Sequence, residues 1–283
     1  MAGVVSEIRV LNLDFNSKRI WGPTPKYPSV LDFKKHSFKL PIIVAGPCSI
    51  ENDFQMKVIA RELAKNGVKW MRGGVYRAGT YGANAEGFKF DLLKRWKRIA
   101  DRNGLKIAVE VVDLSVLGAL NIYADAFQVG ARQMQNYGLL RALARIGKPV
   151  FLKRNMGATL DEFLGAAEYI VSKGTPCVLV ERGSATHMNH VRWDLSVSII
   201  PAIKRMTKIP VIIDASHGTG RRDLVEPMTL AGMAAGADGF MVEVHPQPYF
   251  SISDADQALS LDCLKKLIEK TKCIRKLIKE NVR

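Results

Sequence analysis

The stretch PVFLKRNMGATLDEFLGAAEYIVSKGTPCVLVERG (149–183) contains two short apolar runs, 150–153 and 178–181, on either side of a helical pattern at 159–173. Pro149 stands just before the first run, where a missing amide proton is tolerated. Lys173-Gly174 suits the carboxyl end of the helix. A strand, a helix and a strand in this order predict a right-handed βαβ unit within a parallel sheet.

The same alternation continues from residue 42 to residue 280. We predict strands at 42–45, 70–73, 107–111, 126–129, 150–153, 178–181, 211–214 and 239–244, and helices at 53–66, 88–103, 114–121, 135–146, 159–173, 194–206, 225–235 and 259–280. Runs such as IIVA and VIID suit strands buried on both faces. No GxGxxG follows the first strand, which argues against an open dinucleotide-binding sheet. We therefore expect one (β/α)8 TIM barrel over 41–283. The N-terminal extension, 1–40, has a candidate strand at 8–13 and would be a barrel cap or an oligomer contact.

Length and composition agree with this class of protein. The chain has 283 residues, of which 47% are hydrophobic and 24% charged, close to a barrel of about 250 residues and ordinary globular composition. No apolar run is long enough to span a membrane, and the first residues do not form a signal peptide pattern, so we expect a cytoplasmic protein without a membrane partner. Its four cysteines form no CxxC pair, which favours free thiols.

A formal net charge of +15 raises the alternative of nucleic-acid binding. The basic residues are enriched near 17–40 and 263–283, but they form no RNA-binding motif and are not interleaved with aromatic residues. We therefore expect no nucleic-acid partner. Part of the charge would instead attract an anionic substrate.

Unusual polar residues stand where the predicted strands end, which is where barrel enzymes carry their chemistry. At one strand such residues would be ordinary solvated loop charges. Around one rim, however, like charges would repel each other unless a ligand compensated them. In chain order they are Cys48 and Glu51, Arg72 and Arg77, Glu110, Gln128 and Arg132, Lys153 and Arg154, Glu181 and Arg182, Asp214 and His217, and Glu243 and His245.

Four of the residues at this rim have the side chains of a metal site: Cys48, His217, Glu243 and, in the loop after the last strand, Asp254. A mixed thiolate, imidazole and carboxylate set suits Mn, Fe, Zn or Co more than Ca or Mg. Taken alone, Cys48 is more often a small buried apolar residue, and His217 could serve as a general base.

A second group is cationic and consists of Arg72, Arg77, Arg132, Lys153 and Arg182. Arginine binds carboxylates and phosphates through two parallel hydrogen bonds, and lysine adds a point charge. Several together indicate a substrate with multiple negative charges, such as a phosphorylated carboxylic acid. Ion pairing with Glu110 and Glu181 is the alternative, and Arg221-Arg222 offers further phosphate-binding capacity.

The motifs that carry these residues resemble those of the 3-deoxy-D-arabino-heptulosonate 7-phosphate (DAHP) synthases, in the short class related to the 3-deoxy-octulosonate 8-phosphate (KDO8P) synthases. The matching segments span about 40–270 in the family's order. They are AGPCSIE (45–51), RGG (72–74), QVGARQMQN (128–136), LKR (152–154), ERG (181–183), DASHGTGRR (214–222), GADGFMVEVHPQP (236–248) and SDADQAL (253–259).

The resemblance implies a metal-dependent transferase that joins phosphoenolpyruvate to an aldose phosphate, erythrose 4-phosphate being favoured. The products would be a 3-deoxy-2-keto sugar acid phosphate and inorganic phosphate, in the first step of the shikimate pathway to aromatic amino acids. It implies a divalent metal on Cys48, His217, Glu243 and Asp254, with Lys153 also catalytic. Phosphoenolpyruvate would lie against Arg72, Ala131, Arg132, Lys153 and Arg182, and we expect further substrate contacts from Arg77, Thr80, Asp214 and Arg221. We also expect a homo-oligomer, either a dimer or a tetramer.

The loop after the second strand departs from the family pattern. It reads RAGTY at 77–81, where DAHP synthases have KPRTS and KDO8P synthases have KANRS. Arg77 keeps the charge of the family lysine but does not readily release a proton. Gly79 replaces the arginine that grips the aldose phosphate, and ERGSATH (181–187) lacks another arginine of the family's ERGIRTF.

These losses leave several alternatives open. Arg154, Arg221 or a partner subunit would supply the missing anchor, or the acceptor is another aldehyde, including arabinose 5-phosphate. A catalytically silent barrel that acts as a binding subunit is an alternative of a different class.

Overall fold

The computed structural model of the chain describes residues 38–75 and 89–281. Most of the predicted extension, including the candidate strand at 8–13, lies outside the described residues. So do Arg77, Gly79 and Thr80 from the predicted acceptor loop, and the first residue of the helix predicted at 88–103.

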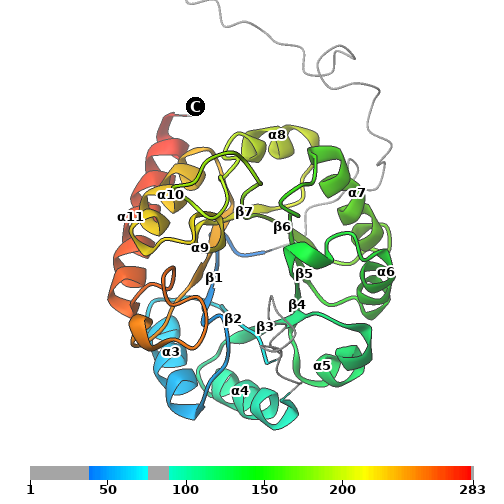
Figure 1. Ribbon diagram of the computed structural model, residues 1–283, viewed down its shortest axis with the longest axis vertical. Helices are drawn as coiled ribbons and strands as arrows, with labels where there is room; N and C mark the ends of the chain where they lie inside the picture. The colour runs from blue at the N-terminus through cyan, green and yellow to red at the C-terminus, as the bar shows by residue number, and fades with distance from the viewer. Residues whose placement is uncertain (1–37, 76–88, 282–283) are drawn as a thin grey trace, which may run out of the picture.

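Eight parallel strands close into a barrel in sequence order, which confirms the predicted fold (Figure 1). Closure is made by β8 against β1, with Ile42 opposite Gly239 and Gly46 opposite Glu243. Each predicted strand is present, with ends that differ by at most one residue. The strands are β1 (Ile42–Gly46), β2 (Trp70–Gly73), β3 (Lys106–Val111), β4 (Ala126–Val129), β5 (Val150–Lys153), β6 (Cys177–Glu181), β7 (Val211–Asp214) and β8 (Gly239–Glu243).

Helices surround this barrel on the outside (Figure 1). They are α3 (Asp53–Lys65), α4 (Phe90–Arg102), α5 (Leu117–Tyr123), α6 (Tyr137–Ile146), α7 (Leu160–Val171), α8 (Ile199–Met206), α10 (Arg222–Ala234) and α11 (Leu261–Asn281). The short helix α9 (Ala215–Thr219) follows directly from β7, and the loops contain the 3-10 turns η2 (Leu114–Val116), η3 (Ala131–Gln133) and η4 (Pro248–Phe250). No helix in the described ranges combines the length and apolar character needed to cross a bilayer.

The helix predicted at 194–206 begins only at Ile199, so that prediction is wrong over its first turn. The preceding residues make backbone hydrogen bonds to other segments instead: Ser184 and Asp194 exchange backbone bonds, and the amide of Arg192 donates to Thr219 O, at the end of α9, at 2.9 Å. Helix α9 was not predicted. It is a single turn, and the carboxylate of Asp214 caps it by accepting from the backbone amide of His217.

Two apolar cores follow from the alternation of side chains along each strand. Outward-facing residues pack with the helices around Trp96, Phe127 and Phe163. Inward-facing apolar residues fill the interior of the barrel below the carboxyl ends of the strands, and we call this packed layer the floor of the barrel. This inner core contains Ile42, Val44, Ala108, Ala126, Phe151, Val178, Val180, Ile212 and Met241.

Barrel closure sets a sharp steric limit at Gly239. A Cβ added there would overlap the backbone of Ile42 on β1. We expect Gly239→Ala to lower the free energy of unfolding by at least about 3 kcal/mol, because two paired strands must separate. Gly118→Ala on α5 is the matched control, since a Cβ there meets nothing within 4 Å. It should stabilise the protein by about 0.5–1 kcal/mol. Urea denaturation measures both, and equal stabilities would contradict this account of closure.

Candidate active site at the mouth of the barrel

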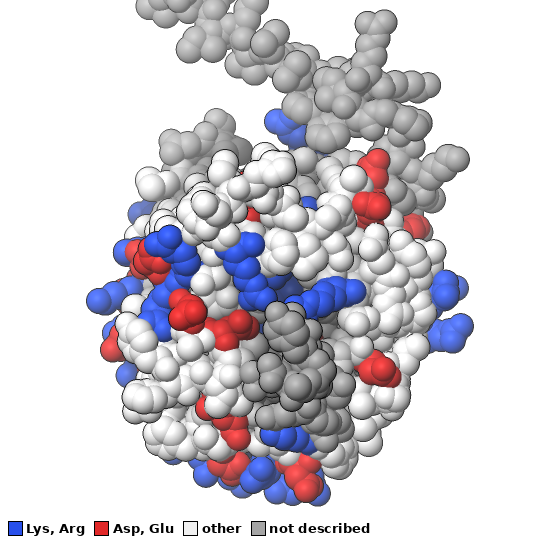
Figure 2. Space-filling model, in the orientation of Figure 1, with Lys and Arg blue, Asp and Glu red and all other residues white. Residues whose placement is uncertain are grey.

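Along several strands, the next inward-facing position towards the carboxyl end after the apolar floor is polar. Two residues beyond Trp70, Phe151, Ile212 and Met241 stand Arg72, Lys153, Asp214 and Glu243, each 3% exposed or less. Because parallel strands end on the same side of the barrel, these side chains converge on one mouth. Figure 2 shows Lys and Arg side chains near the centre of the ring, with acidic side chains beside them.

A cluster of metal-type donors lies on one side of this mouth. Cys48 follows β1, Glu243 ends β8, and Asp254 stands in the loop after η4. One ligand atom from each lies within 4.8 Å of the other two. Asp254 has a φ of +52°, the one positive φ among the described non-glycine residues. The structure thus brings together three of the four residues predicted to bind a metal.

The fourth, His217, lies against Glu243, with Nε2 3.2 Å from Oε1. Its other ring nitrogen, Nδ1, is 2.8 Å from the Asp214 carboxylate, which also receives Lys153 Nζ at 2.8 Å. An Nδ1 proton directed at Asp214 leaves Nε2 with its lone pair towards Glu243. Two acceptors at 3.2 Å require a proton on Nε2 or a cation bound by both. A carboxylate behind a metal-binding histidine is a common arrangement.

Electrostatics keep the buried carboxyl groups of Glu243 and Asp214 ionised. Burial alone would raise the pKa of Glu243, but His217, Arg72 and the hydrogen bond from Gln257 hold it well below its usual range. Burial likewise acts against the charge of Asp214, whose pKa is lowered by His217 and Lys153. The Cys48 thiol has the opposite shift: burial first, then Glu243 and Asp254, raise its pKa. A bound cation would offset the negative charge that Glu243 and Asp254 place beside this thiol.

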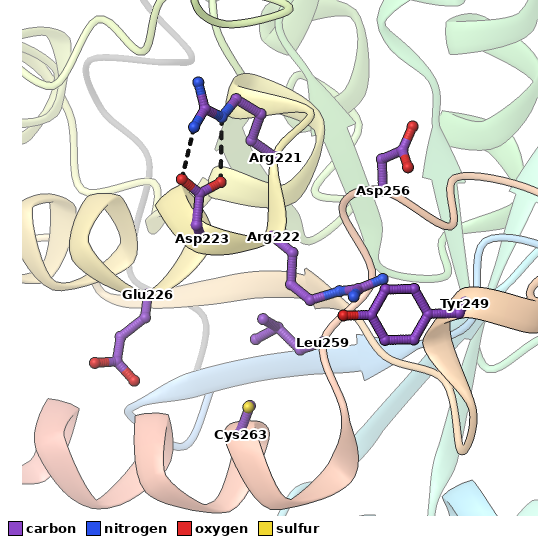
Figure 3. Close-up of a pocket in the computed structure, with 8 residues that line it drawn as sticks. All are labelled: Arg221, Arg222, Asp223, Glu226, Tyr249, Asp256, Leu259 and Cys263. Carbon is purple, nitrogen blue, oxygen red and sulfur yellow. Dashed lines mark hydrogen bonds and ion pairs between the residues drawn. The ribbon is translucent and has the colours of Figure 1, made fainter.

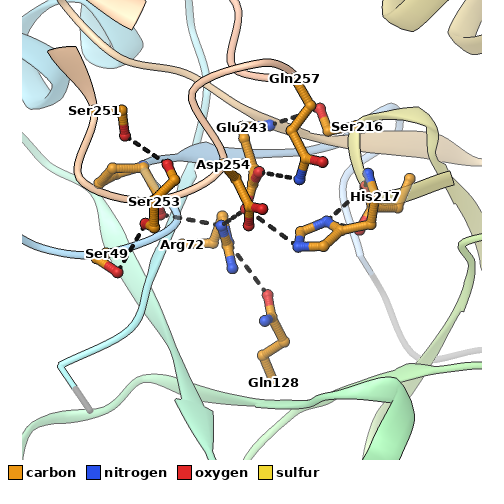
Figure 4. Close-up of polar contacts among 12 residues, drawn as sticks. Ser49, Arg72, Gln128, Ser216, His217, Glu243, Ser251, Ser253, Asp254 and Gln257 are labelled. Atoms are coloured by element: carbon orange, nitrogen blue, oxygen red, sulfur yellow. Dashed lines mark hydrogen bonds and ion pairs between the residues drawn. The ribbon is translucent and has the colours of Figure 1, made fainter. Parts of the chain in front are cut away.

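Hydrogen bonds tie the loop that carries Asp254 to the loop that carries Cys48 (Figure 4). Ser253 Oγ donates to Ser49 Oγ at 2.9 Å, and the amide of Ile252 donates to Glu51 Oε1 at 3.2 Å. His245 Nε2 lies 3.3 Å from the same Glu51 oxygen. These contacts fix the relative positions of the donors at the ends of β1 and β8.

Buried cations occupy the rest of the mouth. Arg72 donates through Nη1 to Glu243 Oε1 at 2.7 Å and to Pro47 O at 3.0 Å, and its Nε points at Gln128. Its Nη2 is buried without a partner among the described residues, as are Nε and Nη1 of Arg182. Because buried donors without a partner are costly, these nitrogens mark the place of an anionic ligand.

The remaining predicted substrate residues differ in their surroundings. Ala131 is buried at the start of η3, whereas Arg132 is exposed. Arg221 is half-exposed and bound to Asp223 through Nε and Nη2, at 3.1 and 2.7 Å. Arg154 is not available as a phosphate anchor, which corrects that expectation. It is buried and donates to both oxygens of Glu181, at 2.5 and 2.9 Å, and to Ala158 O.

Two residues of the mouth, Arg192 and Trp193, were not predicted from the sequence, and they lie in the loop between β6 and α8. The Trp193 ring centroid is 5.5 Å from Arg182 Cζ. Burial is the main cause that lowers the pKa of Arg182, and the positive charge of Arg192 adds to it. No hydrophobic period or strand end marks this loop, so only its backbone bonds to Thr219 and Gly218 could have placed it.

The barrel is closed, and its mouth carries a cluster of metal-type donors and several buried guanidinium nitrogens that have no partner among the described residues. This combination defines a barrel enzyme for a small anionic substrate. Comparison with known proteins then gives the family. A sequence model described as the DAHP synthetase I family matches residues 38–280. The chain therefore belongs to the DAHP synthetase I family.

Individual relatives and a solved structure are also similar to this chain. The phospho-2-dehydro-3-deoxyheptonate aldolase of Thermotoga maritima is 39% identical over 231 residues, which are 81% of this chain and 68% of the relative. The 2-dehydro-3-deoxyphosphooctonate aldolase of Syntrophotalea carbinolica is 30% identical over 258 residues, 84% of this chain and 92% of the relative. The crystal structure of the Thermotoga maritima DAHP synthase superposes with a TM-score of 0.80 at 38% identity, covering 83% of this chain and 69% of that chain.

The ion pair between Arg154 and Glu181 predicts a structural phenotype. Arg154→Met should destabilise the protein by about 3–5 kcal/mol, because it leaves the Glu181 carboxylate buried without its cation. The double variant Arg154→Met/Glu181→Leu should recover much of this loss. Lys204→Met breaks the more exposed pair with Asp238, 2.6 Å apart, and should cost at most about 1 kcal/mol. Urea denaturation measures all three, and similar losses for Arg154→Met and Lys204→Met would show that the pair is not structural.

Proposed function

We propose that this transferase condenses phosphoenolpyruvate with an aldose phosphate, erythrose 4-phosphate being favoured, at the mouth of the barrel. The observation that carries the proposal is the set of buried guanidinium nitrogens on Arg72 and Arg182, which have no partners among residues 38–75 and 89–281, beside the Cys48, Glu243 and Asp254 cluster. Membership of the DAHP synthetase I family supports it. The reaction would be the first step of the shikimate pathway to aromatic amino acids.

Phosphoenolpyruvate binds, in this proposal, against the cationic side of the mouth. Arg182 offers Nε and Nη1, and Arg72 offers Nη2, to its phosphate and carboxylate oxygens. Arg132 and the backbone at Ala131 add contacts from η3. Lys153 is held by Asp214 at 2.8 Å, and its ammonium offsets the charge of the substrate.

Cys48, His217, Glu243 and Asp254 would hold a divalent metal ion such as Mn, Fe, Zn or Co. The fit rests on the 4.8 Å cluster and on the 3.2 Å approach of His217 Nε2 to Glu243. When bound, such an ion supplies Lewis acidity to the aldehyde carbonyl. Asp214 orients the imidazole through Nδ1, and Gln257 Nε2 orients Glu243 by a bond of 2.6 Å to Oε2.

In the proposed reaction, C3 of phosphoenolpyruvate forms a bond to the aldehyde carbon, and the carbonyl oxygen takes up a proton. Water adds at C2, and inorganic phosphate leaves with cleavage of the C2–O bond, which yields the 2-keto group. The cations of the mouth stay in place throughout and stabilise negative charge on the substrate oxygens. Lys153 and His217 both lie against Asp214, so protons at Nζ and Nδ1 are held close to the reacting groups.

A different acceptor, including arabinose 5-phosphate, is the second candidate. Gly79 replaces the family arginine for the aldose phosphate, and several relatives are 2-dehydro-3-deoxyphosphooctonate aldolases. A homo-oligomer, dimer or tetramer, also stays a proposal. Phosphate release from phosphoenolpyruvate with each aldehyde in turn separates these candidates from a silent barrel.

The metal site predicts loss of turnover on ligand removal. Cys48→Ser and His217→Ala should each abolish activity, because each removes a donor. Cys263→Ser changes an exposed thiol and should retain wild-type activity. Metal content is measured alongside steady-state rates. A metal-stripped protein that is fully active without added divalent ion would show that the four-residue site is wrong.

The cationic side predicts loss of phosphoenolpyruvate affinity. Lys153→Ala and Arg182→Ala should each weaken binding by about 2–5 kcal/mol, because each removes a desolvated charge from the anion. Lys173→Ala, an exposed change after α7, is the control and should bind normally. Calorimetric titration gives the dissociation constants. Wild-type affinity in both active-site variants would overturn the assignment.

A further inference from the structure

A cavity of about 440 Å³ opens beside the donor cluster, between the loops that follow β6, β7 and β8. Its lining includes Asn189, Arg192, Arg221, Asp254, Asp256 and Gln257. It shares a wall with the active site, since Asp254 belongs to the donor cluster and Gln257 binds Glu243. A molecule in this cavity can therefore reach the reacting centre without crossing the cationic side assigned to phosphoenolpyruvate.

Arg192 is the most available cation in the lining. Its guanidinium has one hydrogen-bonding or ion-pair partner among the described residues, Asp254, with Nη1 3.5 Å from Oδ1, which is at the long limit of a hydrogen bond. Its side chain is 39% exposed. The remaining donors are therefore free to bind an anion bidentately.

The backbone at Arg192 is nevertheless fixed. Its amide donates to Thr219 O at 2.9 Å, and the amide of Trp193 donates to Gly218 O at 2.8 Å. Gly220, at φ +66°, leaves room for it, because a Cβ there would lie 2.7 Å from Arg192 Cβ. A loosely paired guanidinium on an anchored backbone is preorganised for a ligand.

A second cavity, of about 470 Å³, differs in that its arginines are engaged (Figure 3). Arg222 donates to Ala258 O and Ala255 O and stacks over the Tyr249 ring at 4.1 Å. Arg221, which lines both cavities, is bound to Asp223. Arg192 is thus the better candidate for binding an added anion.

The other groups of the first cavity suit hydroxyls. Asn189 offers an exposed amide and Asp256 an exposed carboxylate, whereas the amide nitrogen of Gln257 is already bound to Glu243. An amide, a carboxylate and a loosely paired guanidinium in one lining match a polyhydroxylated chain that ends in an anion.

We propose that this cavity is the acceptor subsite and that Arg192 binds the terminal phosphate of the aldose phosphate, in place of the arginine that Gly79 replaces. The inference rests on the proposed function, because it assigns the second substrate of that reaction. It makes Arg192 a specificity-determining residue and leaves phosphoenolpyruvate to Arg72, Lys153 and Arg182.

Calorimetric titration tests this without turnover. Erythritol 4-phosphate and arabinitol 5-phosphate lack the aldehyde and are titrated into wild type, Arg192→Ala and Arg192→Lys at saturating phosphoenolpyruvate. Arg192→Ala should weaken binding of the preferred probe by at least about tenfold, and Arg192→Lys by less, since lysine keeps the charge. Affinity for phosphoenolpyruvate should stay within about twofold. Arg98→Ala, an exposed change on α4, should match wild type throughout.

Three results would overturn the inference: no binding of either probe to wild type, unchanged binding to Arg192→Ala, or an equal loss of phosphoenolpyruvate affinity. The last would place Arg192 in the phosphoenolpyruvate pocket. Failure of the proposed function is seen separately, as absence of phosphate release with every aldehyde tested.

Discussion

The structure depends on the two-residue alternation of side chains along eight parallel strands. Two residues further along a strand, the inward-facing side chain changes from an apolar residue of the floor to a polar residue of the mouth. Examples are Phe151 and Lys153 on β5 and Ile212 and Asp214 on β7. Floor and site are therefore built by the same strands. Because the floor excludes water from below, charges above it interact strongly and must be balanced among themselves or by ligands.

Two kinds of buried charge result from this balance. Arg154 and Glu181 satisfy each other and hold the wall of the barrel. Arg182, the next residue after Glu181, is buried with two nitrogens that have no partner in the described part of the chain. Both groups are charged, so charge alone does not distinguish a ligand-binding residue from a structural one. Buried hydrogen-bond donors without a partner do distinguish them.

The sequence predicted the barrel well, because short apolar runs and helix-ending glycines are local signals. It also predicted that Arg72, Lys153 and Glu243 would meet at the mouth, since each stands at or next to the end of a strand. It failed where position depends on distant contacts. Asp194, in the first turn of the helix predicted at 194–206, hydrogen-bonds to Ser184 instead. The neighbouring amide of Arg192 bonds to Thr219, and these contacts bring Arg192 to the mouth. Likewise, nothing local showed that Arg154 would pair with Glu181.

The proposed reaction, in which phosphoenolpyruvate reacts at C3 and loses phosphate from C2, rests on the family membership and on the geometry of the mouth. The most direct test uses phosphoenolpyruvate labelled with ¹⁸O at the oxygen that bridges C2 and phosphorus. The protein is incubated with it and aldose phosphates of three to five carbons, and the released phosphate is analysed by mass spectrometry. We predict phosphate release only when an aldehyde is present, with the label in the phosphate. Release without an aldehyde, or unlabelled phosphate, would contradict the account.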